Sequence, residues 1–383
     1  MKKLLILVLS LLLVACSTSP KEEVKKPAPK DSVISFIGVG DNLIHDSIYK
    51  EADKLAGTEG DGTYDFTGMY EPVKDDIKKA DLAFINQETI LGGDDLGLSG
   101  YPTFNSPSVI ASQLNQVGFD LVNTASNHAL DKGMLGIENA KATWSKEKNM
   151  ITAGTYTSNE DRNNIPVIKR KGVTFSFLAY TYGTNGVSLP NDYCVALFDD
   201  ARITSDVQAA KEVSDVVIVS AHWGDENMNQ TSEMQKHYAQ LFADLKVDVV
   251  IGTHPHVIQP IEWVKGTTGN ETLVVYSLGN FLSGMLDVGN VLGGEIKFDF
   301  VKNQKSKEIK VKNVKWIPLV THYKGDPNNI MESRNNYKIY RLSDYSEEMA
   351  KTHGLNNYEG QSVKVDDLME RTKKVIDEKW MMD

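Results

Sequence analysis

The segment 251–256 carries the clearest chemical signal in this chain. It reads IGTHPH, follows an apolar run, and places His254 and His256 one residue apart. Alternate side chains of an extended or turning backbone can converge on one point, and neutral imidazole is the commonest nitrogen ligand of metals in proteins. The segment therefore predicts a metal site just beyond a buried strand.

Four other apolar runs of strand length also end in residues that can bind metals. In chain order, the polar groups that follow these runs are Asp41 with His45, Asn86 with Glu88, Asn127 with His128 and Asp131, and His222 with Asp225 and Glu226. Ligands of open α/β sheets bind beyond the carboxyl ends of the strands. Five strands that deliver these side chains to one edge would make a metal site. The mixture of oxygen and imidazole suits Mn, Fe or Zn better than Ca or Mg.

Each of these residues also has a simpler explanation. Asp41 could cap a helix, Asn127 could form an Asx-turn, and His222 could pack beside Trp223 with a carbonyl partner. Several such coincidences, each at the end of a strand, are less probable than one shared site. We therefore interpret the set as a single metal site.

Other polar residues leave two alternatives open or are expected to be structural. Asp225 and Glu226 are either solvated loop charges or outer-shell partners of His222. Asn280 either hydrogen-bonds to the loops of the site or has no role there. The histidines expected to be structural are His237, His322 and His353.

The elements that would position the site alternate along the chain. Apolar runs at 34–39, 82–85, 121–125, 175–180, 216–221, 248–251 and 273–277 predict strands, and amphipathic spacing at 107–117, 135–148, 201–213 and 232–246 predicts helices. This alternation implies an α/β domain, which we place at 32–322. Alternating patterns at 295–301 and 309–320 predict a hairpin at its end. The polar segment 323–383 is expected to be a helical extension, with helices at 346–351 and 363–380.

Composition narrows the class of partner. The chain has 383 residues, 52 of them acidic and 41 basic, for a net charge of −11. No basic stripe is present to neutralise phosphates, so nucleic acid is excluded as an expected partner. Any anionic substrate would need the metals or a local basic patch, and the sequence shows no such patch.

The N-terminus has the pattern of a bacterial export signal. Two lysines precede the apolar run 4–13, which is too short for a membrane span. The sequence LVAC at 13–16 closes this segment and places Cys16 last. This pattern resembles the bacterial lipobox, so we expect a lipoprotein signal peptide at 1–15, a lipid on Cys16 and a flexible tether at 16–31. An ordinary signal peptide is the alternative. With Cys16 lipidated, only Cys194 remains, so no internal disulfide forms and Cys194 is expected to be buried.

Six motifs together resemble the CapA family of poly-γ-glutamate capsule synthesis proteins. In order, they are GD at 40–41, NxE at 86–88, SNHALDxG at 126–133, HWGxE at 222–226, HPHVxQ at 254–259 and SLGNF at 277–281. The resemblance covers about residues 33–290. The family is similar to the calcineurin-like metallophosphoesterases. It therefore implies a fold of two packed mixed β-sheets flanked by helices, a four-layer sandwich with a dinuclear metal centre at the strand ends.

The same resemblance implies a role for each site residue. His128 would protonate the leaving group, and the metal ligands would be Asp41, Glu88 as the bridge, Asn127, His222, His254 and His256. Asp131 would then orient the His128 imidazole. The chain departs from the phosphoesterase pattern at two positions. Leu43 stands where a histidine is usual, so His45 is the expected replacement. Glu88 stands where the bridging residue is usually aspartate.

These observations lead to one expected function and two alternatives. We expect a lipid-anchored protein on the extracytoplasmic face of the cell membrane. It would act in the synthesis of poly-γ-glutamate capsule or a related envelope polymer, with two divalent metals (Mn, Fe or Zn) in a hydrolase-type site. Its expected partners are the membrane, a poly-γ-glutamate synthase complex and an anionic polymer or phosphorylated substrate. The alternatives are a stand-alone surface metallophosphoesterase and a non-catalytic, polymer-handling subunit.

Overall fold

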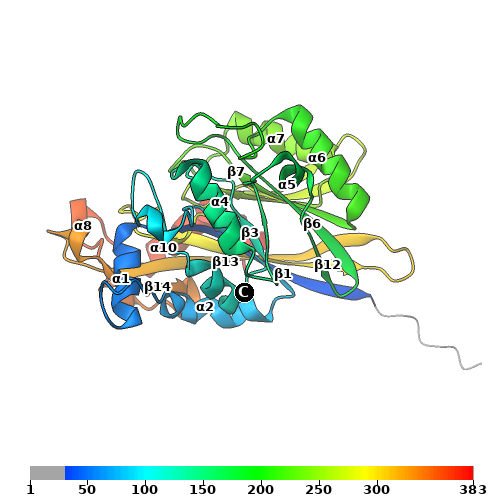
Figure 1. Cartoon of the computed structure of the whole chain (residues 1–383). Helices are drawn as coiled ribbons and strands as arrows, with labels where there is room; N and C mark the ends of the chain where they lie inside the picture. The colour runs from blue at the N-terminus through cyan, green and yellow to red at the C-terminus, as the bar shows by residue number, and fades with distance from the viewer. Residues whose placement is uncertain (1–30, 383) are drawn as a thin grey trace, which may run out of the picture.

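The computed structural model of the protein describes residues 31–382 (Figure 1). The predicted signal peptide and the predicted tether up to residue 30 lie outside the described residues. The strands are β1 (Ser32–Leu43), β2 (Leu82–Gln87), β3 (Leu121–Asn123), β4 (Ile151–Ala153), β5 (Val167–Arg170), β6 (Val173–Thr181), β7 (Val216–His222), β8 (Val249–Thr253), β9 (Ile261–Lys265), β10 (Glu271–Val275), β11 (Asn280–Ser283), β12 (Leu292–Lys302), β13 (Ile309–Lys324) and β14 (Asn335–Arg341). The helices are α1 (Asp46–Ala56), α2 (Thr67–Lys79), α3 (Ile110–Val117), α4 (Gly133–Trp144), α5 (Asn159–Asn163), α6 (Asp200–Val213), α7 (Glu233–Asp244), α8 (Ile330–Ser333), α9 (Glu347–Ala350) and α10 (Val365–Val375).

The strands form two mixed sheets. The first has the order β14-β13-β12-β1-β2-β3-β4, and β11 pairs in parallel with the end of β1. In this sheet β1 to β4 are parallel neighbours, whereas β12, β13 and β14 add an antiparallel half. The second sheet has the order β5-β6-β7-β8-β10-β9, with a parallel centre and antiparallel edges.

The two sheets pack face to face, and helices cover their outer sides. Phe84 of β2 meets Phe177 of β6 with ring centroids 5.9 Å apart, and Phe175 meets Phe300 at 5.0 Å. In Figure 1, α6 and α7 lie above the second sheet and α2 lies below the first. The central strands are buried along their whole length, as parallel strands covered on both faces must be. The predicted fold class, two packed mixed sheets flanked by helices, is confirmed.

Two glycines allow strand ends of the two sheets to approach closely. A Cβ atom on Gly40 would lie 1.8 Å from the carbonyl oxygen of Gly279, and one on Gly252 would lie 1.9 Å from that of Tyr276. No side chain fits at either position. These contacts bring the end of β1 and the end of β8 against the segment 276–279, which lies between β10 and β11.

The extension at 323–383 is not wholly helical, which differs from the expectation. Residues 335–341 form β14, which pairs antiparallel with β13 and extends the first sheet. The reason is a period of two, because Tyr337 and Ile339 are buried while the residues beside them are not. The expected helices are present in shortened form as α9 and α10.

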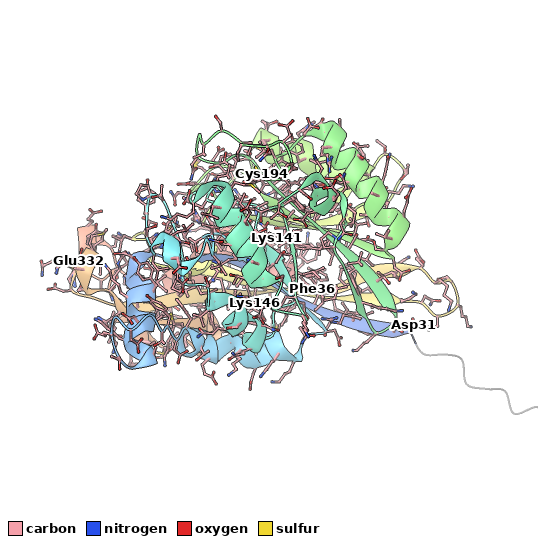
Figure 2. All side chains as sticks on the ribbon, in the orientation of Figure 1. Asp31, Phe36, Lys141, Lys146, Cys194 and Glu332 are labelled. Atoms are coloured by element: carbon pink, nitrogen blue, oxygen red, sulfur yellow. The ribbon has the colours of Figure 1, made fainter. Side chains whose placement is uncertain are left out.

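Cys194 is a free, fully buried cysteine, as expected (Figure 2). Within residues 31–382, no helix has the length and apolar character needed to cross a bilayer.

Candidate metal centre

The carboxyl ends of β1, β2, β3, β7 and β8 meet at one edge of the sandwich. Each delivers one or two of the predicted ligands within a few residues of its end: Asp41, Glu88, Asn127, His222, His254 and His256. Two contacts join the sheets directly. The Nδ1 of His256 lies 3.1 Å from Asp41 Oδ2, and the Nε2 of His222 lies 2.9 Å from Asn127 Oδ1. All six residues are at most 4% exposed, so the site is a buried cluster.

These ligands form two triads that share one residue. Asp41, Glu88 and His256 make the first triad, and Glu88, His222 and His254 make the second. In each, the ligand atoms lie within 4.8 Å of one another. Asn127 Oδ1 lies beside His222 and adds a fourth possible metal ligand to the second triad. Because Glu88 belongs to both triads, the arrangement is that of two cation positions bridged by one carboxylate.

The chemistry of the donor atoms fits a bound cation. Both carboxylate oxygens of Glu88 and the Nδ1 of His254 are buried and have no hydrogen-bond partner among the described residues. A buried polar atom without a partner costs free energy, so native proteins rarely retain one without a use for it. Here three such atoms lie at the centre of the cluster. They are the atoms that divalent Mn, Fe or Zn would coordinate.

The electrostatics of the cluster point the same way. Burial and the neighbouring histidines hold the pKa of His222 and of His254 well below the usual range, which keeps both imidazoles neutral and able to bind metal. Burial and the nearby Asp41 carboxylate raise the pKa of Glu88 well above its usual range. Burial alone would lower the pKa of His256, but Glu88 and Asp41 raise it to about 10. Without a cation, a proton therefore offsets part of the buried negative charge.

A ring of amides and a hydroxyl holds the ligands in place. Asn86 donates to Asp41 Oδ1 at 2.7 Å, and Asn123 in turn donates to Asn86 Oδ1 at 2.9 Å. Thr253 Oγ1 lies 3.0 Å from the Nδ1 of His222. Asn280 Oδ1 lies 3.1 Å from the Nδ1 of His256, so its alternative role as a partner of the site matches the structure. Such outer contacts fix the ring orientation of ligating histidines.

The two histidines after β8 have strained backbones. His254 has φ +97° and His256 has φ +59°, values that residues other than glycine rarely adopt. Strain of this kind persists where the surrounding structure imposes it, and it is concentrated at functional sites. It aims both imidazoles into the cluster despite the intervening Pro255.

His128 and Asp131 lie together beside the metal ligands. The Nδ1 of His128 is 2.8 Å from Asp131 Oδ2, which also accepts from the backbone N–H of Phe104 at 2.6 Å. The Phe104 ring packs edge-on against the His128 ring, with centroids 4.7 Å apart. The carboxylate and the aromatic ring together restrict the imidazole to one orientation.

His45 is not brought into either triad. It is the last residue before α1, and its Nδ1 lies 3.1 Å from both the Leu43 carbonyl oxygen and the Gly284 amide nitrogen. Within residues 31–382, the clusters of ligand atoms do not include it. Burial and the Arg334 guanidinium lower its pKa to about 3. Because the chain turns into α1 at this point, the ring packs on Phe104 instead.

Two residues of the site are absent from the sequence prediction. Tyr182 packs against His254 with centroids 4.5 Å apart and ring planes tilted by 41°, and Asn185 accepts from Asn127 Nδ2 at 3.2 Å. The Nδ2 of Asn185 also lies 3.5 Å from the Nδ1 of His128. Both follow β6, and the sequence prediction includes that strand but no site residue beyond its end. The rule applied to the other five strands would have found them.

The remaining histidines lie away from the cluster. His237 is exposed on α7, where its Nε2 is 3.1 Å from Asp200. His322 and His353 are buried between β13 and the C-terminal extension, with centroids 5.3 Å apart.

Fold and site together define an α/β protein of two mixed sheets with a candidate dinuclear centre at the strand ends. The family model described as bacterial capsule synthesis protein PGA_cap matches residues 35–285. The chain therefore belongs to this family, as the resemblance to CapA proteins predicted. All seven predicted metal ligands, His45 among them, lie within the matched residues.

Two curated relatives share part of the sequence. The PGA biosynthesis protein CapA of Bacillus subtilis is 32% identical over 171 residues, which are 44% of this chain and 44% of the relative. The capsule biosynthesis protein CapA of Bacillus anthracis is 27% identical over 175 residues, which are 44% of this chain and 41% of the relative. The matched segments thus span less than half the length of these relatives.

Two solved structures are also similar. A novel phosphatase from Mycoplasma pneumoniae is 16% identical with a TM-score of 0.45, covering 76% of this chain and 94% of that one. A putative 5'-nucleotidase from Staphylococcus aureus is 14% identical with a TM-score of 0.46, covering 75% of this chain and 54% of that one.

Proposed function

We propose that this protein acts in the synthesis of poly-γ-glutamate capsule or a related envelope polymer, through a hydrolase-type centre that holds two divalent metals. The observation that carries the proposal is the pair of triads that share Glu88. Their metal-ligating atoms include both Glu88 oxygens and the Nδ1 of His254, which are buried and have no hydrogen-bond partner among the described residues. Membership of the capsule synthesis family supports the process.

The residues of this chain divide the work between binding and proton transfer. One cation would be held by Asp41, Glu88 and His256, and the other by Glu88, Asn127, His222 and His254. When bound, two divalent metals would supply Lewis acidity toward a substrate oxygen. The carboxylate of Asp131 occupies the Nδ1 of His128, which leaves the Nε2 of that ring to deliver a proton to the leaving group.

The proposal includes the cell surface as the place of action. Cys16 after the LVA run would carry the lipid, and residues 17–31 would tether the fold to the extracytoplasmic face of the membrane. A synthase complex for the polymer would be the partner there. Palmitate labelling and membrane fractionation of Cys16→Ser test this part, because labelling that matches the wild type would refute the anchor.

A stand-alone surface metallophosphoesterase is the second candidate. The close pairing of His128 with Asp131 beside the ligand Asn127 favours it, since a phosphoester leaving group needs such an acid.

One experiment separates these functions. Purified protein is offered aryl phosphomonoesters, phosphodiesters and γ-glutamyl oligomers side by side with Mn, Fe or Zn, while capsule is measured in cells carrying Asp41→Ala or His128→Ala. We expect both variants to abolish polymer formation. Rapid phosphoester cleavage, together with normal polymer in a deletion strain, would replace the capsule proposal with the second candidate. No turnover in vitro, with polymer lost in both variants, would assign the site to binding or assembly.

A further inference from the structure

Glu226 is an exposed residue on a loop whose backbone is firmly held. The loop after β7 is tied to the turn that carries the two site histidines. Asn227 donates its backbone N–H to the Pro255 carbonyl at 2.8 Å, and Asn229 Nδ2 donates to the Ile258 carbonyl at 2.8 Å. Gln259 Nε2 donates to the Met228 carbonyl, also at 2.8 Å. A solvated surface loop would not require three such ties, so the position of Glu226 is fixed by its neighbours.

The Glu226 carboxylate reaches the rim of the metal centre. One of its oxygens lies within 4.8 Å of ligand nitrogens of both His254 and His256. The ion pairs formed among residues 31–382 do not include Glu226, so no lysine or arginine there neutralises it.

The two cation positions differ in their number of protein donors. The second has four, Glu88, Asn127, His222 and His254, whereas the first has only the three of its triad. Leu43, where the related phosphoesterases have a histidine, is buried and offers no donor atom. His45 bonds elsewhere. Any fourth protein ligand of the first position would therefore come from another segment, and the loop after β7 is the one that brings a carboxylate there.

We propose that Glu226 is the fourth protein ligand of the cation held by Asp41, Glu88 and His256. This inference rests on the metal centre of the proposed function. It is carried by the closeness of the Glu226 carboxylate to His256 and by the buried, unpartnered oxygens of Glu88 in the same triad.

This assignment makes the two positions chemically unlike. With Glu226, the first position has three carboxylates and one imidazole, whereas the second has two imidazoles, a carboxylate and an amide oxygen. Carboxylate-rich sites favour Mn, and imidazole-rich sites suit Zn or Fe. Glu226 is also the only exposed ligand of the set, so an anionic substrate can displace it without disturbing the buried core.

Metal titration of the purified chain tests the assignment. Apo protein is titrated with Mn²⁺ and with Zn²⁺ by calorimetry, and bound metal is counted after dialysis. For Glu226→Gln we expect the affinity for one of the two metal equivalents to fall by at least about tenfold. That is the smallest effect of losing an outer-shell partner, and losing a direct ligand should cost no less. The loss should be greater for Mn²⁺ than for Zn²⁺, and Glu226→Asp should restore part of it.

The control is Asp225→Asn, which removes the adjacent exposed carboxylate from the same loop and should leave both affinities unchanged. The melting temperature of apo Glu226→Gln should equal that of apo wild type, which excludes misfolding. If wild type binds two metals and Glu226→Gln binds both equally well, the inference is wrong while the metal centre stands. If wild type binds no metal, the centre itself fails.

Discussion

The metal centre and the C-terminal extension each bury a group of histidines, but the two groups differ in what completes them. His353 accepts from the Leu355 N–H at 3.1 Å and its Nε2 lies 3.2 Å from the Thr321 carbonyl, so both ring nitrogens have partners within the fold. His322 pairs with the Tyr345 hydroxyl at 2.7 Å. At the centre, by contrast, the Nδ1 of His254 has no partner among the described residues.

Burial and pKa do not distinguish the two groups. Burial is the main cause of the lowered pKa at His222 and His254 and also at His322 and His353. His254 and His353 differ instead in whether each ring nitrogen has a hydrogen-bond partner. Both ring nitrogens of His353 have partners within the fold, whereas the Nδ1 of His254 is buried without one among the described residues and is available to bind a metal. Breaking each group in turn tests this distinction.

The largest effect is expected from His254→Ala combined with His256→Ala. These changes remove one ligand from each triad, so bound metal should fall from roughly two equivalents to nearly none. The thermal stabilisation by added metal should disappear with it, because a ligand at 100 times its Kd contributes about 2.7 kcal/mol to the folded state. Elemental analysis and melting curves with and without Mn²⁺ measure both. His353→Ala is the matched control and should keep its metal.

A smaller effect is expected from His128→Ala. Its imidazole is held by Asp131 and is not a member of either triad, so metal content should remain near that of wild type. Turnover on whichever substrate the wild type cleaves should fall by about 10²–10⁴-fold, the usual contribution of a general acid. Asp131→Asn should lower turnover less. Loss of metal in His128→Ala would show that this histidine is a ligand instead.

The extension should respond to acid. Burial, helped by Lys324, lowers the pKa of His322 to about 4, and burial, helped by His322, lowers that of His353 to about 3. Folded values below the unfolded value mean that this stability is complete above about pH 6.5 and is lost as the pH falls toward 4. The slope is about 1.4 kcal/mol per pH unit for each ring.

Urea unfolding at pH 7, 6 and 5 measures this slope. His353→Gln cannot take up the proton, so the slope should be shallower than in wild type by up to one ring's share. Equal slopes in the two proteins would mean that the His353 ring does not titrate with unfolding.

The smallest effect is expected from His237→Ala. This exposed histidine belongs to neither buried group and only meets Asp200 on the surface. Surface pairs of this kind contribute about 0–1 kcal/mol, so stability, metal content and turnover should all stay close to wild type. A large change in any of them would show that exposure is a poor guide to which histidines matter here.

Much of the fold followed from local patterns. Apolar runs such as 216–221 are short and rich in β-branched residues, which favours a covered strand, and the polar residues at their ends indicate the site. Helices α1 and α2 are absent from the sequence prediction. In α2 the reason is a mostly polar sequence that contains Pro72. Short strands such as β4 and β11 depend on pairing with β3 and β1, and no local pattern in the sequence records that pairing.

The same limit explains the candidate ligands. His45 is close to Asp41 along the chain, and spacing alone favoured it, but α1 begins immediately after it and turns the ring aside. Glu226 is far from Asp41 along the chain, and only the tertiary packing of its loop onto the turn at 254–258 shows that it reaches the centre. Sequence spacing predicts ligands within one segment. It does not predict which loop of the second sheet folds over the first.

Strand β1 is more than a member of the sheet, because it sets a distance. Strand β1 begins just after Asp31, which lies on the side of the molecule opposite Glu332 in Figure 2. Asp41 lies near the other end of the strand. At about 3.3 Å per residue, the strand holds the centre roughly 33 Å from the point where the chain enters the fold. If Cys16 carries the proposed lipid, β1 would act as a rigid spacer between the side of the fold that faces the anchor and the metal centre. A protein built this way would work on polymer already clear of the headgroups rather than on material still lying in the bilayer.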